Sequence, residues 1–257
     1  MSQLRVTAII IAATLSLLSV QPTNAQTAPA IRTPVLVELF TSEGCSSCPP
    51  ADALLAKLDH DQPIQNADII VLGEHVDYWE SVQWHDRFAS SQYTDRQKLY
   101  GQRLRFDEVY TPQMVVDGSN QFVGSDAAHA VRAITQAAQT PKLPLSLARP
   151  VVDGRRISSS VSAPPTESHG DLYAALVDIS DTTEVRGGEN GGRRLQHAGV
   201  VRNLQRIGSL KDLSAKPLAF SLKSPGDANL AAMRVVVFAQ QNGQGNILGA
   251  VTTAVTP

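Results

Sequence analysis

Residues 35–50 read VLVELFTSEGCSSCPP, and this stretch decides the fold. Its first six residues form a nearly continuous apolar run, which is typical of a strand buried on both faces of a sheet. A short polar turn and two cysteines follow, and the two prolines after them favour the first turn of a helix. Apolar residues then recur at helical spacing, at Ala51, Leu54, Leu55 and Leu58. The sequence therefore predicts a buried strand, a turn that carries two cysteines, and a helix.

Cys45 and Cys48 are the two cysteines of the 257-residue chain. A disulfide between them would close a very small ring, for which the gain in chain entropy is least, so a stabilising role explains the pair poorly. At a helix N-terminus, free N–H groups and the helix dipole favour a thiolate. The spacing thus predicts a redox pair in which Cys45 is the attacking thiol and Cys48 resolves the mixed disulfide. A structural disulfide and a metal-binding dithiol remain alternatives.

Residues 1–25 have the pattern of an export signal. Arg5 supplies the positive start, an apolar run covers residues 6–20, and Ala25 ends a small-residue cleavage site. The run is too short for a comfortable membrane span. Cleavage after Ala25 would leave 232 residues and move the formal net charge from −2 to −3, because the segment holds one basic and no acidic residue. We expect a periplasmic or secreted protein with no stable membrane span, and the acidity argues against a nucleic-acid partner.

Beyond a spacer at 26–34, the chain changes character once. Residues 35–139 alternate strands and helices, which predicts an α/β domain with a strand at 69–73, a hairpin over 115–123 and a last helix over 126–138. A linker at 139–144 follows. Residues 145–257 carry short alternating strands, which predict a mostly-β, sandwich-like domain of roughly six or seven strands. Residues 200–207 are the one helix expected there.

An insertion at 74–110 contains eight of the thirteen aromatic residues. We expect a helical cap that builds a small core of its own, with a substrate groove as the alternative. His75, Asp77 and His85 could join the cysteines in a metal site, although histidines beside aromatic residues are more often packed or exposed. We expect no metal and no cofactor.

The first half resembles the thioredoxin superfamily over residues 35–138. That family has a buried strand, a Cys-x-x-Cys motif that opens a helix, a second strand and a cis proline. The stretch YTPQMVV at 110–116 matches the proline segment. The resemblance implies that Pro112 is cis, that Thr111 offers its backbone to an extended substrate, and that Glu38 is a buried acid that handles protons. The alternatives are a plain loop proline and a Glu38 that reaches solvent at a sheet edge.

The whole chain is similar to an uncharacterised, exported, thioredoxin-like family of proteobacteria that is catalogued as a domain of unknown function. The matching segments are residues 38–51, 75–79, 110–118 and 186–204. This resemblance implies the fold and export, but no reaction. The Ser-Ser dipeptide between the cysteines differs from that of thioredoxins, so the direction of electron flow stays open.

The segment RGGENGGRR at 186–194 is the one unusual feature of the second half. It fits a glycine-rich loop between strands, or a loop that meets the first half or a client protein. Taken together, the sequence predicts an exported thiol–disulfide oxidoreductase whose partners are protein thiols or disulfides and a redox partner protein. A Cu(I)-binding module and an interaction protein with a structural disulfide are the alternatives.

Overall fold

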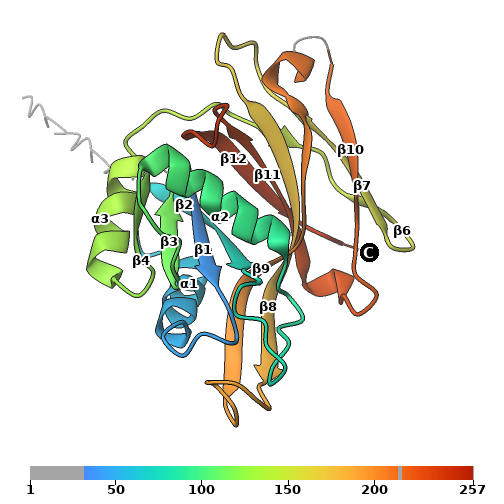
Figure 1. Ribbon diagram of the computed structural model, residues 1–257. Coiled ribbons are helices and arrows are strands. Elements are labelled where there is room, and N and C mark those ends of the chain that lie inside the picture. The colour runs from blue at the N-terminus through green and yellow to red at the C-terminus, as the bar shows by residue number, and fades with distance from the viewer. Residues whose placement is uncertain (1–31, 214–215, 257) are drawn as a thin grey trace, which may run out of the picture. The chain divides into compact units, whose positions relative to one another are not determined.

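The computed structural model describes residues 32–213 and 216–256 (Figure 1). The predicted export signal and most of the spacer lie outside the described residues. No helix within the described ranges is long and apolar enough to cross a membrane. In chain order the helices and strands are β1 (Thr33–Thr41), α1 (Pro49–Asp61), β2 (Ala67–His75), α2 (Ser91–Leu104), β3 (Gln113–Val116), β4 (Asn120–Val123), α3 (Ala127–Ala137), β5 (Ser146–Leu147), β6 (Val151–Asp153), β7 (Arg156–Ser162), β8 (Asp171–Glu184), β9 (Arg194–Ser209), β10 (Leu218–Lys223), β11 (Met233–Gln240) and β12 (Ile247–Ala254), with short 3-10 helices at Leu210–Leu213 and Leu230–Ala232.

One large mixed sheet runs through both halves of the chain. Its strand order is β12-β11-β8-β9-β2-β1-β3-β4 (Figure 1). β1 pairs in parallel with β2 and antiparallel with β3. The halves join where β2 and β9 meet in parallel at Gly73 and Val200. The fold is therefore mixed α/β, with three α-helices in the described ranges.

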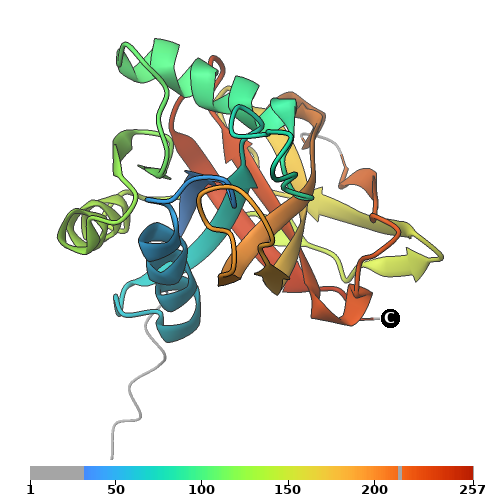
Figure 2. The ribbon, with the colours of Figure 1, turned by 60° about the horizontal axis from the view of Figure 1, so that its bottom comes forward.

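The helices lie on opposite faces of the β1–β2 region. Val37 and Leu39 of β1 pack on the face that α1 and α3 cover, with Leu55 and Ile134. The intervening residues of β1 point to the other face, where α2 lies (Figure 2). Residues 42–48, which include both cysteines, join the end of β1 to the start of α1.

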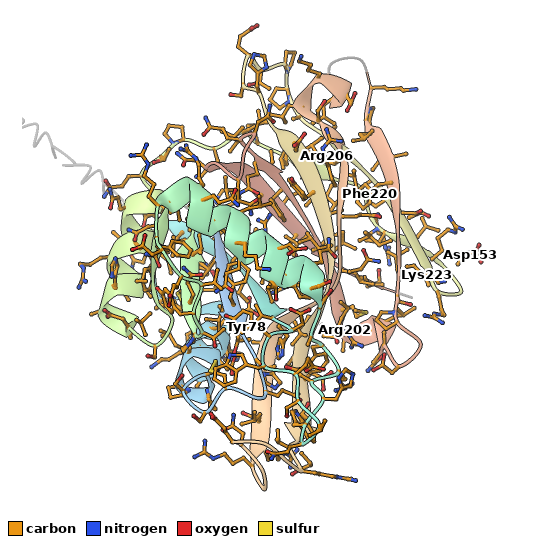
Figure 3. All side chains as sticks on the ribbon, viewed as in Figure 1. Tyr78, Asp153, Arg202, Arg206, Phe220 and Lys223 are labelled. Carbon is orange, nitrogen blue, oxygen red and sulfur yellow. A yellow bond between two sulfur atoms is a disulfide. The ribbon has the colours of Figure 1, made fainter. Side chains whose placement is uncertain are left out.

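In the second half two sheets share a core, and one of the two is the large sheet. A second sheet of β10, β7 and β5, with β6 on β7, packs against β8, β11 and β12. Figure 3 shows Phe220 and Lys223 on this side of the molecule, away from Tyr78 of the insertion. The residues predicted as two separate domains, 35–139 and 145–257, fall within one compact unit of the chain.

The physical reason is a shared core. Leu36 and Ile70 from the first half pack with Val177 and Phe238 from the second, beneath Tyr93 of α2. Apolar contacts across the β2–β9 junction remove any boundary at the predicted linker. The local sequence pattern does not predict such a junction, because β2 and β9 are far apart in the sequence.

One local expectation also changes. The helix expected at 200–207 is part of the strand β9, because pairing with β8 on one side and β2 on the other outweighs the local helical pattern. The insertion does contain a helix, α2, whose N-cap Ser90 accepts a hydrogen bond from the Gln92 N–H. Its aromatic side chains at Tyr93 and Tyr100 are buried in the core, which agrees with an insertion that packs rather than one that opens a groove.

Candidate functional site at the Cys45–Cys48 disulfide

Cys45 and Cys48 form a disulfide, with a Cα–Cα distance of 5.4 Å. Both residues are completely buried, whereas the two serines between them are exposed. Cys48 is the residue before α1, and its carbonyl oxygen accepts hydrogen bonds from the N–H groups of Ala51 and Asp52. The predicted pairing and the predicted helix start are confirmed. The burial of the sulfurs was not expected.

The Thr111–Pro112 peptide bond is cis, as predicted. Pro112 is buried. Gly124 lies between Pro112 and Ala51 in the first turn of α1: a Cβ placed on Gly124 would be 3.2 Å from the first and 3.1 Å from the second. The Trp79 indole N–H donates a 2.7 Å hydrogen bond to the Thr111 hydroxyl. Trp79 also lies against the turn before the cysteines, within 3.1 Å of a Cβ placed on Gly44. The insertion thus fastens the proline segment to the cysteine turn.

Glu38 is buried, but on the face of the sheet opposite α1. Its carboxylate accepts hydrogen bonds from the Arg96 guanidinium at 2.6 Å and from the Tyr100 hydroxyl at 2.5 Å, both on α2. The geometry therefore does not favour the proton-handling role that the resemblance implied for Glu38. The alternative of a solvent-reaching edge position is wrong.

The acids near the cysteines are instead Asp52 and Glu43, and an imidazole lies between them. His197 of β9 has Nε2 at 3.5 Å from Glu43 Oε1 and Nδ1 at 4.0 Å from Asp52 Oδ2. The second oxygen of each acid is held by a neutral donor: the Thr41 hydroxyl bonds Asp52, and the Trp84 indole bonds Glu43. All three titratable side chains are buried.

Four atoms of this group have no hydrogen-bond partner in the structure: Glu43 Oε1, Asp52 Oδ2, and both ring nitrogens of His197. Buried polar groups are normally paired, and leaving one unpaired costs on the order of 1–3 kcal/mol. The imidazole faces one acid with each nitrogen, and the four unpaired atoms all belong to this one group.

A second acid–imidazole pair adjoins the first. His75, at the end of β2, bonds Asp86 at 2.7 Å. Asp86 also accepts the backbone N–H groups of Glu43 and Phe88. The His75 and His197 rings meet edge to face, with centroids 4.9 Å apart. The turn before Cys45 is therefore hydrogen-bonded to one pair and in contact with the other.

Burial and mutual charge set the protonation of these groups. Burial raises the pKa of Asp52, although His197, His75 and the Thr41 hydroxyl act in the opposite direction. Burial alone would lower the pKa of His75, but the carboxylates of Asp86, Asp52 and Glu43 together outweigh it and the pKa is raised. Burial opposes ionisation of Asp86, yet His75 and two backbone N–H groups bring the pKa of Asp86 down to about 2. Asp52 and His75 therefore keep their protons to higher pH than they would in water, whereas Asp86 ionises more readily.

The glycine-rich loop of the second half covers the disulfide. The Asn190 side-chain amide donates 2.9 Å hydrogen bonds to the carbonyl oxygens of Glu43 and Cys45. The neighbouring Glu189 carboxylate accepts the Ser46 N–H at 3.2 Å. The segment is a loop between the strands β8 and β9, and it also meets the first half at the cysteine turn, so both interpretations of it hold.

The metal ligands considered from the sequence are not brought together. Asp77 bonds the Thr94 hydroxyl, His85 is exposed and bonds Glu80, and His75 is taken by Asp86. In the described part of the chain, no group of three or more His, Cys, Asp or Glu side chains could hold a metal ion.

Residues 36–240 match the family of proteins of unknown function designated DUF1223. The chain belongs to the DUF1223 family. A crystal structure of a structural-genomics protein from Agrobacterium tumefaciens is similar, with 26% identity, a TM-score of 0.67, and coverage of 90% of this chain and 97% of that one. A domain of the outer membrane lipoprotein Omp28 from Porphyromonas gingivalis aligns at 11% identity and a TM-score of 0.32, over 45% of this chain and 89% of that one. No curated protein matches the chain significantly.

Sequence reasoning missed Asp52, Glu43 and His197 in this DUF1223 member. Asp52 carried a usable signal, because it follows Cys48 by four residues and lies on the buried face of α1 with Leu55. His197 lies within the matching segment 186–204, but nothing in its local pattern placed it beside the cysteines, which are far away in sequence.

Proposed function

We propose that this DUF1223 protein is an exported thiol–disulfide oxidoreductase with a thioredoxin-like core, and that Cys45 and Cys48 are its redox pair. The observation that carries the proposal is the disulfide itself, which spans the start of α1 beside a buried cluster of acids and imidazoles. A disulfide of this ring size adds little stability. Reduction of a disulfide consumes two protons, and the neighbouring cluster can hold them.

The exchange begins when a client thiolate attacks the Cys45 sulfur. The Cys45–Cys48 bond breaks, a client–Cys45 disulfide forms, and Cys48 leaves as a thiolate. A second client thiolate then attacks the client sulfur of the mixed disulfide and releases Cys45. The client dithiol is oxidised and the protein disulfide is reduced, and the same steps in reverse reduce a client.

Asp52 is placed to protonate Cys48 when it leaves. It follows Cys48 by one helical turn, and burial raises its pKa so that its proton is retained closer to neutrality. His197 lies between Asp52 and Glu43, with its ring nitrogens 4.0 Å and 3.5 Å from their carboxylate oxygens. Cys48 is completely buried, so bulk water does not contact it in this structure.

Thr111 and Pro112 keep the role that the resemblance implied. The cis bond precedes β3, and Trp79 holds the Thr111 hydroxyl. The backbone of Thr111 would then pair with an extended client segment. The expected partners are protein thiols or disulfides and a redox partner protein, in the periplasm or outside the cell.

The test is a trapping experiment in the native export compartment. Replacing Cys48 with Ser leaves Cys45 without its resolving thiol, so client proteins should accumulate as adducts that dithiothreitol releases. Cys45→Ser is the matched control and should trap nothing. Equal adduct levels in both variants, or none in either, would remove the proposal. Retention of Cu(I) by the reduced protein without any adduct would support a metal-binding module instead.

A further inference from the structure

The cover over the disulfide is part of a two-stranded arm. β11 pairs with β8 only as far as Asp178, and from Ser180 to Glu184 the strand β8 pairs with β9 alone. Figure 1 shows this ribbon extending past the rest of the sheet. We call residues 180–198 the arm. Isolated two-stranded ribbons are marginally stable, so the arm depends on what it touches.

The tip of the arm, residues 185–193, is stabilised by hydrogen bonds within itself. The Gly192 N–H bonds the Val185 carbonyl, the Val185 N–H bonds the Arg193 carbonyl, and the Arg193 side chain bonds Asn190 Oδ1. Gly188 and Gly192 have φ of 67° and 82°, which suits glycine and fixes the tight turn. The tip can therefore move as a unit while it keeps its own bonds.

Three hydrogen bonds in the structure join the tip to the cysteine turn. They are the two hydrogen bonds from Asn190 and the one accepted by Glu189. Gly187 also lies against the insertion, where a Cβ would come within 2.0 Å of the Gln83 carbonyl oxygen. Net hydrogen-bond contributions are modest, so breaking these three bonds costs little compared with unfolding. The buried Val185 and Asn190 add to the cost of lifting the tip.

The main-chain groups of the cysteine turn that the tip contacts could also bind a peptide backbone. The Asn190 side chain is a carboxamide, the same group as a peptide bond, and it donates to two main-chain carbonyls. The neighbouring Ser46 N–H receives an acceptor. A polypeptide backbone offers both N–H donors and carbonyl acceptors, so a client segment can satisfy the same three groups.

We propose that the arm closes the disulfide in the absence of a client, and that a client polypeptide lifts the tip and places its backbone where the Asn190 carboxamide now lies. The proposal rests on the proposed function for its client, but the closure itself does not depend on it. With both cysteines at 0% exposure, no protein thiolate reaches Cys45 while the tip is down.

The experiment measures how fast the disulfide of the mature protein is reduced, by a phosphine and by reduced thioredoxin as a protein dithiol. Asn190→Ala should accelerate reduction by the protein dithiol about tenfold, because it removes two of the closing bonds. Glu189→Gln should accelerate it about two- to fivefold. Arg186→Ala, an exposed tip residue away from the turn, is the matched control and should match the wild type.

The outcomes separate this proposal from the function. Wild-type rates in both Asn190→Ala and Glu189→Gln would overturn the closing role of the arm, whatever the trapping experiment gives. Faster reduction of these variants by both reagents, with no client trapped by Cys48→Ser, would keep the arm and remove the oxidoreductase. Glu189 is exposed, so its variant folds even where Asn190→Ala is destabilised.

Discussion

Individual side chains around Cys48 carry the chemistry that the account needs. Asp52 has a raised pKa and an oxygen with no hydrogen-bond partner, a combination that costs stability and is typical of functional acids. The cysteine motif could be recognised from its spacing alone. The partner imidazole, His197, could not, because only the pairing of β9 with β2 brings it to the site.

Replacing Asp52 with Asn should slow exchange roughly 100-fold at neutral pH, since Cys48 loses its proton donor. Stability should not fall in parallel. The pKa of Asp52 is raised in the folded protein, so its carboxyl stabilises the fold at pH values below its unfolded pKa of about 3.8. The wild type loses this stabilisation as the pH rises, and the Asn variant does not. Stopped-flow exchange rates and urea denaturation measure the two effects. Asp61→Asn, an exposed acid on the same helix, is the control.

The His75–Asp86 pair should make stability depend on pH. His75→Gln should cost about 3–5 kcal/mol at pH 6, because it leaves a buried carboxylate without its partner. The pKa of His75 is raised in the folded protein, so the cost of the substitution should shrink as the pH rises through that raised pKa. The cost should also shrink below about pH 4, where Asp86 begins to protonate toward its folded pKa of about 2. His60→Gln, at an exposed site, should change stability by less than about 0.5 kcal/mol. A cost independent of pH would contradict the pairing.

At the scale of elements, local pattern predicted what local forces decide. The apolar run of β1, the prolines before α1 and the capped helix α3 follow from the sequence. The strand β9 and the position of Glu38 did not, because both depend on partners distant in sequence. Glu38 meets Arg96 and Tyr100 only because α2 crosses the face of β1 opposite α1.

This face also holds a second acid, Glu74 of β2. Burial and the nearby Glu38 carboxylate raise the pKa of Glu74 well above its usual value, and Arg96 only partly offsets them. Glu74→Gln should therefore become more stable than the wild type as pH rises above about 4.5, with a slope approaching about 1.4 kcal/mol per pH unit. Denaturation at pH 5 and pH 8 tests this. Glu108→Gln, at an exposed site, should show no such trend.

At the scale of the whole molecule, the two halves are one structure. The shared core and the continuous sheet leave neither half with a complete apolar interior. The sequence showed the change in character near residue 140, but not that β9 would continue the first sheet. The site itself depends on this union, because His197 and Asn190 come from the second half and the disulfide from the first.

The union predicts one cooperative unfolding transition for residues 32–256. Calorimetry should give equal van't Hoff and calorimetric enthalpies. A fragment of residues 32–140 should fail to fold alone, because it exposes Leu36 and Ile70. Two separate transitions, or a folded fragment with a native disulfide environment, would restore the picture of two domains.

The reduction potential of the Cys45–Cys48 pair tests the central proposal most directly. Equilibration of the mature protein with glutathione or dithiothreitol buffers, followed by thiol alkylation and mass measurement, gives the value. An exchange catalyst should have a potential between about −270 and −120 mV, and we expect the Cys45–Cys48 pair to lie in this range. A potential below about −300 mV, typical of structural disulfides, would contradict it.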